Sequence, residues 1–326
     1  MSNLRSAVAV LGAALLLAAH AAHAQEANFP SRPITLMVGF APGGGTDQIA
    51  RLLAPKVGEL LKQTIIIENK AGASGTLAAA QVAKASPDGY TLLMGHVSSN
   101  AMVPAIKSKM LYNAAVDFTP LTVIGSVPLV VTVPAASPAK SIKDFIQLTK
   151  AQPGKFNYAS SGVGTQQHFA AELFELDTGA KMTHVPYKGS GAAVTDLIAG
   201  QVDVNFDTLP SVLPHIQAGK LRALAVTTRE RQSLLPGIPT LIEAGLPEYD
   251  IGAWYMVMGP AKLPPALVEK ISSAFIAAAR DPATRARLNA ISTDVVASTP
   301  DQARKYLASE IDRWSHVAKT RNIHEE

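Results

Sequence analysis

Glycine-rich loops that open helices are the residues of this sequence best suited to chemistry with a ligand. The first loop, Gly39–Asp47, reads GFAPGGGTD and stands between a predicted strand and a predicted helix. Three adjacent glycines let the backbone approach a ligand closely. The helix N-terminus adds unpaired amides and a partial positive charge. The loop therefore predicts an anion site at the start of the helix.

The spacing of these glycines does not match the two common nucleotide-binding patterns. G-x-G-x-x-G fails because Gln48 occupies the third glycine position after Gly43 and Gly45. G-x-x-x-x-G-K-[ST] fails because Gly45 replaces the lysine. An isolated glycine cluster could also be a tight turn without a ligand. Repetition of the pattern elsewhere in the chain would favour a ligand site over a plain turn.

The same strand, loop and helix pattern recurs twice. Tyr158–Thr165 reads YASSGVGT after another predicted strand, and Asn69–Thr76 reads NKAGASGT. Two helix N-termini facing each other across a cleft would hold a carboxylate through backbone amides, without an arginine. This close approach needs the missing side chain of Gly164, so a valine at that position should block the ligand.

Histidines and aspartates near the loops could support catalysis or metal binding. His96, His168 and His184 lack a close second ligand of the H-E-x-x-H kind, and ligand contact is expected for the first two. Asp47 is expected to cap its helix, and Asp207 could face the cleft. The nucleophile pattern G-x-S-x-G is absent. We therefore predict no catalytic residue and no metal site.

Short β-branched runs alternate with helical patterns along the chain, which predicts an α/β fold with mostly parallel strands. A proline inside the first helix, Pro55, should kink or restart it. Ser141 and Asp144 predict a capping box, and two long helices at 265–280 and 300–319 close the chain. The predicted strands are 34–40, 64–68, 90–95, 121–133, 156–159, 182–186, 202–206, 221–227 and 253–258.

One predicted strand indicates two lobes. The run 121–133 is unusually long and contains Pro128, as expected of a strand that leaves one lobe and enters another. A return crossing is expected within 221–259. Two crossings make a hinge, and a hinged cleft suits reversible capture of a small ligand. The predicted division is a discontinuous first lobe of 25–124 and 230–326, and a second lobe of 125–229.

The first 24 residues have the layout of a secretory signal peptide. Arg5 supplies a positive charge, 7–19 is apolar, and Ala22-His23-Ala24 is a small-x-small cleavage site. The apolar run is shorter than the ~20 residues that span a bilayer. We therefore expect an exported, soluble chain in the periplasm. The absence of cysteine excludes a cysteine-linked lipid anchor, disulfides and thiolate metal sites.

Composition limits the remaining classes. Removal of the signal leaves 302 residues, a length typical of two lobes or domains. The net charge is +4, and the basic residues are scattered, whereas nucleic-acid binding needs a clustered basic face. No later segment holds 18 uninterrupted apolar residues, so no transmembrane helix is predicted. No nucleic-acid partner and no cofactor are expected, and a monomer is the simplest oligomeric state.

Seven stretches of the chain jointly resemble the Bug family of periplasmic solute receptors, the substrate-binding component of tripartite tricarboxylate transporters. The resemblance implies a type II periplasmic-binding fold that closes over its ligand. It also implies a small carboxylate ligand, which could be a dicarboxylate, a tricarboxylate, an amino acid or an aromatic acid, and membrane permease subunits as partners. The stretches are PSRPIT (30–35), FAPGGGTD (40–47), IENKAGASG (67–75), PDGYTLL (87–93), SGVGT (161–165), VPY (185–187) and WY (254–255).

The residues expected at the ligand combine the loops with positions that the resemblance implies. The resemblance makes 41–47 the first clamp and 160–165 the second, with Tyr187 and Asp207 on the far side of the cleft. The full set is Phe40, Ala41, Pro42, Gly43, Gly44, Gly45, Thr46, Asp47, Ser74, His96, Ser98, Asn100, Ser160, Ser161, Gly162, Gly164, Thr165, His168, Tyr187 and Asp207.

The sequence leaves the ligand and two alternative functions open. The rings of Phe40, Tyr187 and Trp254, with His168, would suit a planar or aromatic acid. A periplasmic hydrolase or isomerase on the same fold would need a nucleophile, a base and an orienting group close in space. A receptor that feeds a membrane sensor would use the same cleft without transport.

Overall fold

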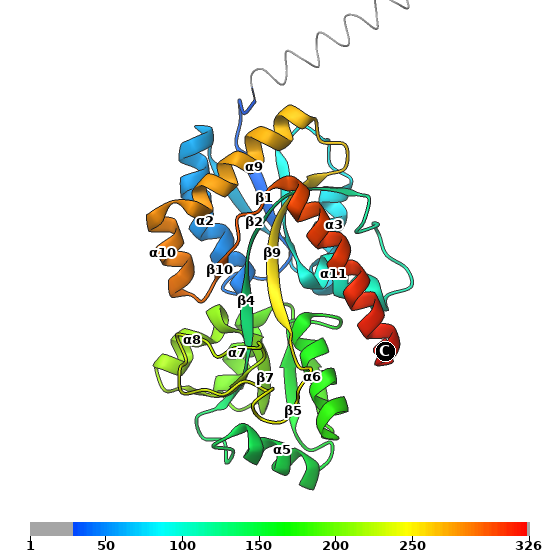
Figure 1. Cartoon of the computed structure of the whole chain (residues 1–326), viewed down its shortest axis with the longest axis vertical. Coiled ribbons are helices and arrows are strands. Elements are labelled where there is room, and N and C mark those ends of the chain that lie inside the picture. The colour runs from blue at the N-terminus through cyan, green and yellow to red at the C-terminus, as the bar shows by residue number, and fades with distance from the viewer. Residues whose placement is uncertain (1–28, 325–326) are drawn as a thin grey trace, which may run out of the picture.

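The strand β4 (Phe118–Pro134) runs through both lobes of the molecule (Figure 1). This computed structural model describes residues 29–324, so the predicted signal peptide lies outside the described residues. The strands form one sheet in the order β2-β1-β3-β9-β4-β7-β5-β6, and β8 and β10 also pair with β4. The predicted crossing strand is confirmed. We call the half that holds β1–β3 the first lobe and the half that holds β5–β8 the second lobe.

The predicted strands are all present within a few residues of their predicted bounds. Only β10, two residues long, was missed, because so short a strand has no pattern of alternation. In chain order the other strands are β1 (Ile34–Val38), β2 (Ile65–Asn69), β3 (Thr91–His96), β5 (Asn157–Ser160), β6 (Thr183–Pro186), β7 (Val204–Thr208), β8 (Leu221–Val226), β9 (Gly252–Pro260) and β10 (Asp294–Val295).

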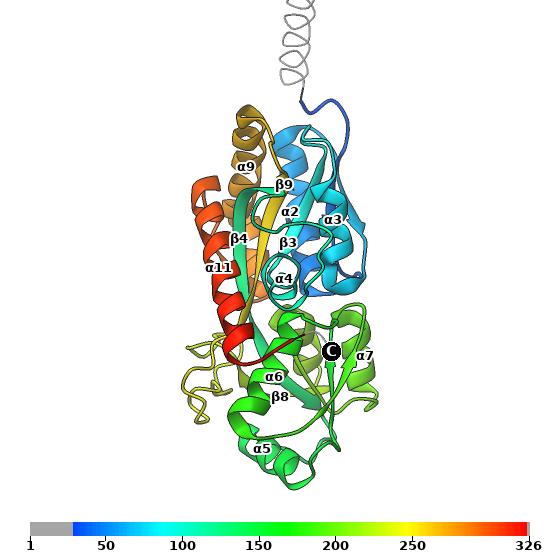
Figure 2. The ribbon, with the colours of Figure 1, turned by 90° about the vertical axis from the view of Figure 1, so that its right-hand side faces the viewer.

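Helices cover both faces of the sheet (Figures 1 and 2). No helix within 29–324 combines the length and apolar character that crossing a membrane requires. The α-helices are α2 (Gly45–Leu61), α3 (Thr76–Ala83), α4 (Val103–Ile106), α5 (Ile142–Ala151), α6 (Gln166–Thr178), α7 (Ser190–Ile198), α8 (Leu209–Gln217), α9 (Pro265–Arg280), α10 (Pro282–Ala290) and α11 (Pro300–Thr320). Two single turns, η1 (Ala73–Gly75) and η2 (Ser98–Met102), precede α3 and α4.

Two local predictions about helices had different outcomes. The capping box is present, since Ser141 Oγ accepts from the Asp144 amide and the Asp144 carboxylate accepts from the Ser141 amide. Of the predicted kink or restart at Pro55, the restart is wrong, because α2 continues through it to Leu61, and the kink stays a prediction. Pro55 lies on the exposed side of α2, where water can bond to the carbonyl that the proline leaves unpaired.

The parallel strands of each lobe point their carboxyl ends at the other lobe. In the first lobe β1 is parallel to β2 and β3, and in the second lobe β5 is parallel to β6 and β7. In open α/β sheets, ligands bind in the crevice beyond the carboxyl ends of the strands. The loops after these six strands therefore meet between the lobes.

The two crossings between the lobes lie side by side. From Phe118 to Pro128, β4 pairs antiparallel with β9, and from Leu129 onward it pairs with β7 and β8. Pro128, which has no amide hydrogen, stands where β4 changes partners. Thr227 ties the crossings together: its Oγ1 donates to the Ile251 carbonyl over 2.6 Å, and its amide donates to the Leu129 carbonyl over 3.1 Å. The predicted lobe boundaries themselves stay a prediction.

A buried carboxylate fastens α11 to the second crossing. One oxygen of Glu310, Oε2, accepts the indole N–H groups of Trp254 on β9 and Trp314 on α11, each over 2.9 Å. The ring of Trp314 also packs edge-on against Phe169 of α6, with centroids 5.5 Å apart. Because α11 contacts both lobes, it supports the back of the hinge (Figure 2).

Replacing Glu310 with alanine should lower the free energy of unfolding by about 2–4 kcal/mol, because two buried indole donors lose their acceptor. Glu310→Gln is the matched control, since its carbonyl oxygen can still accept both bonds, and it should cost about 1 kcal/mol or less. Urea unfolding of the three proteins measures the difference. If the free energy of unfolding fell equally in both variants, the oxygen that accepts from the two indoles would not contribute to stability.

Candidate ligand-binding cleft

The loops at the carboxyl ends of the strands touch across the space between the lobes. The Gly45 amide of the first lobe donates to Ser211 Oγ of the second over 3.1 Å. Ser98 Oγ donates to Gln166 Oε1 over 2.6 Å and accepts from the Gln166 amide over 3.1 Å. In the side view, α4 lies directly above the second lobe (Figure 2). These contacts enclose a cleft between the lobes.

Two adjoining cavities fill this cleft, and Phe40 and Ser161 line both of them. The inner pocket measures about 10 Å³, which is room for a group the size of one water molecule. It is lined by Phe40, Gly44, Gly45, Thr46, His96, Ser161, Gln166, Ser190, Thr208 and Tyr255. The outer cavity measures about 270 Å³ and is lined by Phe40, Gly72, Ala73, Ser74, Gly75, Val103, Lys107, Ser161, Gly162, Val163, Tyr187 and Lys188.

The structure divides the predicted contact residues into two groups, and ligand binding by either group stays a prediction. Nine of them line a cavity: Phe40, Gly44, Gly45, Thr46, Ser74, His96, Ser161, Gly162 and Tyr187. The other eleven line neither cavity: Ala41, Pro42, Gly43, Asp47, Ser98, Asn100, Ser160, Gly164, Thr165, His168 and Asp207.

Asp47 holds the first loop in shape. Its carboxylate accepts from the Gly43 amide over 3.0 Å, from Arg51 Nε over 3.0 Å and from Asn69 Nδ2 over 2.9 Å. Burial raises the pKa of Asp47, but the hydrogen bonds from Arg51, Gly43 and Asn69 outweigh it, so the pKa lies below its ordinary value of 3.8. The ionised carboxylate therefore braces the loop from within the first turn of α2.

Amides of the second loop are already occupied by side chains of the same lobe. The Gly162 amide donates to Ser160 Oγ and the Gly164 amide donates to His168 Nδ1, each over 3.1 Å. At Gly164 φ is +75°, and a Cβ there would lie 2.9 Å from Val103 of the first lobe. A side chain at Gly164 would thus collide with the opposite lobe, whereas the sequence predicts that it would block the ligand.

Ser160 and His184 form a close pair of the kind that a hydrolase would need. Ser160 Oγ and His184 Nε2 are 2.6 Å apart. The ring of His184 lies nearly parallel to the rings of Tyr158 and His168, with centroid separations of 4.7 and 4.5 Å. Burial lowers the pKa of His184 to about 4 and that of His168 to about 3. Because Ser160 is fully buried and lines neither cavity, this pair supports the loop and does not face a substrate.

Neutral donors line the inner pocket. Burial lowers the pKa of His96 to about 3, so the ring is neutral at physiological pH. Its Nδ1 accepts from the Ser98 amide over 3.2 Å, which leaves the proton on Nε2. The ring lies between Phe40 and Tyr255, with centroids 5.1 and 5.2 Å away. Among the described residues, the fully buried hydroxyl of Tyr255 makes no hydrogen bond of good geometry, and the nearby Thr208 side chain only partly opposes the rise of its pKa that burial causes.

Asp207 lies behind the inner pocket and orients two of its lining residues. Its Oδ1 accepts from Ser190 Oγ over 2.8 Å and from the Thr208 amide over 2.7 Å, and its Oδ2 accepts from Asn205 Nδ2 over 3.0 Å. Gln167 Nε2 in turn donates to Ser190 Oγ over 3.0 Å. Burial raises the pKa of Asp207 to about 6, although these hydrogen bonds oppose the rise.

The structure places only two of the four rings that were predicted to contact an aromatic acid at the cleft. Trp254 is buried against Glu310, and His168 bonds to the second loop, so neither ring lines a cavity. Phe40 and Tyr187 do line the outer cavity. The cleft therefore keeps two of the four predicted rings, and its inner pocket is lined by the rings of His96 and Tyr255.

Several lining residues were not in the predicted set. Ser190 follows Gly189 at the start of α7, after β6, and repeats the strand, glycine and helix pattern that found the first loops. The same search could have identified it. Gly72, Ala73, Gly75 and Val163 lie within the predicted glycine loops 69–76 and 158–165, whereas Val103, Lys107 and Lys188 carry no such local pattern. The residues missed are Gly72, Ala73, Gly75, Val103, Lys107, Val163, Gln166, Lys188, Ser190, Thr208 and Tyr255.

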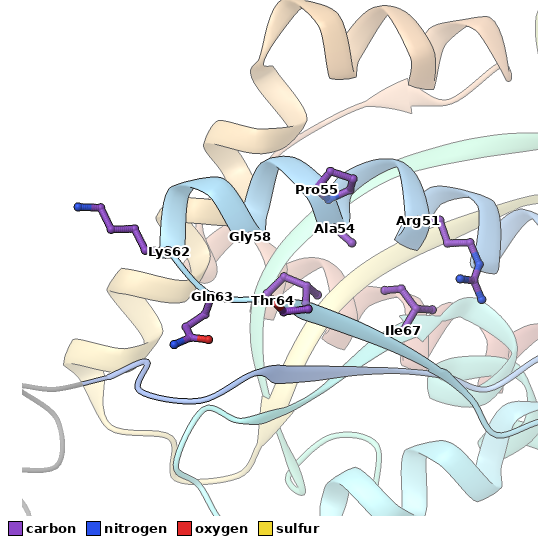
Figure 3. A pocket seen from close by; sticks show the side chains of 9 residues that line it. Arg51, Ala54, Pro55, Gly58, Lys62, Gln63, Thr64 and Ile67 are labelled. Carbon is purple, nitrogen blue, oxygen red and sulfur yellow. The ribbon is translucent and has the colours of Figure 1, made fainter.

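A larger hollow of about 690 Å³ lies on the first lobe between α2 and β2, and Figure 3 shows its lining side chains. It shares no lining residue with the cleft. Of its basic residues, Arg51 is engaged with Asp47 and Asn69, and Lys62 lies at the far end (Figure 3). Because the polar groups of the hollow do not converge, the cleft is the stronger candidate site.

Two lobes joined by paired crossing strands, with a polar cleft beyond the carboxyl ends of their strands, define a two-lobed periplasmic solute-binding protein. A family model described as "Tripartite tricarboxylate transporter family receptor" matches residues 49–323. The chain belongs to this family of receptors, and the predicted Bug-type membership and fold are confirmed.

Similar proteins agree with this assignment over nearly the whole chain. Protein BugT of Bordetella pertussis is 36% identical, over 97% of this chain and 98% of BugT. The solved structure of periplasmic binding protein BugD has a TM-score of 0.89 at 29% identity, and covers 91% of this chain and 100% of that chain. R. palustris Rpa4515 with adipate has a TM-score of 0.88 at 36% identity, with coverages of 91% and 99%.

The raised pKa of Asp207 makes the stability of the ligand-free protein depend on pH. The unfolded chain ionises this carboxyl near its ordinary value of 3.8, whereas the folded protein ionises it near 6. The folded state therefore holds the extra proton between these values, and stability falls as pH rises from about 4 to about 6. The loss attributable to Asp207 should be about 3 kcal/mol.

Urea unfolding of the wild type and Asp207→Asn between pH 4 and 7 measures this loss. Asparagine cannot ionise, so the free energy of unfolding of the variant should not fall with pH on account of position 207. A loss of stability that is the same at every pH does not affect the comparison, because only the slopes against pH are compared. Parallel curves for the two proteins would contradict the raised pKa.

Proposed function

We propose that this protein is a non-enzymatic receptor that captures a small carboxylate in the interlobe cleft and delivers it to the permease subunits of a tripartite tricarboxylate-type transporter. The observation that carries the proposal is the buried hydroxyl of Tyr255, which reaches the inner pocket without a hydrogen-bond partner among the described residues. An unpaired buried hydroxyl costs about 1–3 kcal/mol, and an acceptor on a ligand would remove that cost.

The inner pocket favours an acceptor that carries negative charge. The first turn of α2 contributes partial positive charge, and the amides of Thr46 and Asp47 are among those that a helix leaves without an intrahelical acceptor. The Nε2–H of His96 adds a neutral donor to the lining. Asp207 lies close by, but its own donors shield its charge.

The two cavity sizes indicate how a carboxylate would sit. The inner pocket has room for one oxygen-sized group, and the body of the ligand would occupy the outer cavity. One carboxylate oxygen would then accept from Tyr255, at the junction that Phe40 and Ser161 share. Because the Gly162 and Gly164 amides already have acceptors, the first loop and these side chains supply the donors. Adipate in the R. palustris relative supports a ligand of this class.

The competing functions have less support. A hydrolase would need its nucleophile at the cavity wall, whereas the close pair of Ser160 and His184 is buried behind the second loop. A receptor that signals to a membrane sensor would use the same cleft, and only its partner would differ. The family of transporter receptors favours transport.

A thermal-shift screen tests the proposal directly. Mature protein is heated with mono-, di- and tricarboxylates, amino acids and aromatic acids, and a ligand specific for the native state raises the melting temperature. Mass spectrometry of the ligand afterwards should find it unchanged. The absence of a shift with every acid would refute carboxylate capture, and turnover of any acid would refute the non-enzymatic role.

Tyr255→Phe should weaken binding of the acid that gives the largest shift by about 10–100-fold, because a hydrogen bond to a charged acceptor is lost. The melting temperature without ligand should stay the same or rise, since the removed hydroxyl has no partner to lose. Tyr249→Phe is the matched control. Its buried hydroxyl donates to the Ala170 carbonyl, so it should lose stability and keep its affinity within about twofold.

Titration calorimetry and thermal unfolding of both variants separate the two effects. If Tyr255→Phe bound the acid as tightly as the wild type, the hydroxyl would not be part of the site. A melting temperature that fell as far as that of the control would also contradict the unpaired hydroxyl.

A further inference from the structure

A buried carboxyl group stands directly behind the inner pocket. Asp207 on β7 is fully buried, and its hydrogen-bond donors are the Ser190 hydroxyl, the Thr208 amide and the Asn205 side-chain amide. All three donors are neutral, so they stabilise the charge of the carboxylate without cancelling it. Because Ser190 and Thr208 also line the inner pocket, this charge lies immediately behind the wall against which a ligand carboxylate would rest.

The charge of Asp207 reaches the wall of the inner pocket. Burial raises the pKa of Tyr255, and the charge of Asp207 raises it further. His96, which lines the pocket, and His168 on α6 are neutral at physiological pH, because burial lowers the pKa of each to about 3. An ionised Asp207 would therefore repel a ligand carboxylate in the inner pocket. The surrounding elements face Asp207 with neutral groups: Val130 of β4, Gln167 of α6, Ser190 of α7 and Tyr255 of β9.

Ser190 connects this carboxyl group to the pocket through a single proton. Its Oγ accepts from Gln167 Nε2 over 3.0 Å and donates its only proton to Asp207 Oδ1 over 2.8 Å. A Cβ on Gly44 of the first lobe would lie 3.9 Å from this oxygen, so the oxygen lies beside the first loop. While Asp207 is ionised, Ser190 can only accept from a group in the pocket, and a ligand carboxylate has no proton to donate. A proton on Asp207 makes its carboxyl a weaker acceptor, which frees the Ser190 proton for the ligand.

We infer that Asp207 takes up one proton from solvent when a carboxylate enters the inner pocket, so that the protein captures the acid together with a proton and Ser190 donates to the bound acid. This inference rests on the proposed function, because the acid must occupy the inner pocket. The only bond that forms is the O–H bond on Asp207, and the proton returns to solvent when the acid leaves. The buried site then holds one negative charge both before and after capture, which avoids the cost of burying a second one.

Titration calorimetry with hexanoate, benzoate, succinate and adipate counts the protons, because proton uptake from buffers of different ionisation enthalpy changes the measured heat. Burial raises the pKa of Asp207 in the free protein to about 6, and the like charge of a bound acid raises it further. At pH 7 each bound acid should therefore bring about half a proton or more with it. Affinity should be highest below pH 6 and should fall about fivefold or more between pH 6 and pH 8. The acids lose their own protons below about pH 6 and do not contribute.

Asp207→Asn should bind each acid with an affinity that changes by less than about twofold between pH 6 and pH 8, and without proton uptake, because the amide cannot ionise. Asp203→Asn is the matched control. Asp203 precedes β7 in the same lobe, accepts from the Asn157 amide over 2.7 Å and lines neither cavity. This control should keep the proton uptake and the pH dependence of the wild type.

Binding of an acid by the wild type without proton uptake, or proton uptake that persists in Asp207→Asn, would overturn the inference and leave carboxylate capture standing. The proton count of the wild type needs no variant, so it tests the inference even if Asp207→Asn fails to fold. Failure of all four acids to bind to the wild type would overturn carboxylate capture itself, and the proton uptake with it.

Discussion

The path of β4 through both lobes is the constraint on which the rest of the structure depends. One continuous strand belongs to both halves of the sheet. The direction of β4 therefore sets the direction of the strands that pair with it in each lobe. The parallel strands of each lobe then run toward the same space, and their carboxyl-end loops must meet there. At Pro128 the strand β4 stops pairing with β9, and Thr227 joins the two crossings near that point. The hinge and the cleft therefore both follow from the path of β4.

Side-chain hydrogen bonds inside the loops decide which groups remain for a ligand. Asp47 braces the first loop, and His168 occupies an amide of the second. These bonds hold the loops in place before any ligand arrives, which reduces the ordering cost of binding. They also remove part of the amide clamp that glycine-rich loops suggest. The hydrogen-bond donors that line the inner end of the cleft are therefore those of the first turn of α2, Tyr255 and His96.

The two ends of the cleft are lined by groups of different chemistry. At the inner end, buried neutral donors and a helix terminus favour an anion without introducing a counter-charge. At the outer end, the lining combines Lys107 and Lys188 with the apolar side chains of Val103 and Val163. Behind the hinge, α11 contacts the second lobe through Trp314, which packs against Phe169.

The sequence by itself determined the strands, the helix starts, the crossing at Pro128 and the receptor family, because these depend on local periodicity, capping residues and short motifs. It also located the first glycine loop, whose residues Gly44 and Gly45 line the cleft. Only the tertiary structure decided that Tyr255 lies beside Gly45 and that Lys107 and Lys188 line the same cavity. It also decided that amides of the second loop donate hydrogen bonds to side chains of the same lobe. Such contacts join residues far apart in the chain, and their geometry follows from side-chain packing that no local pattern encodes.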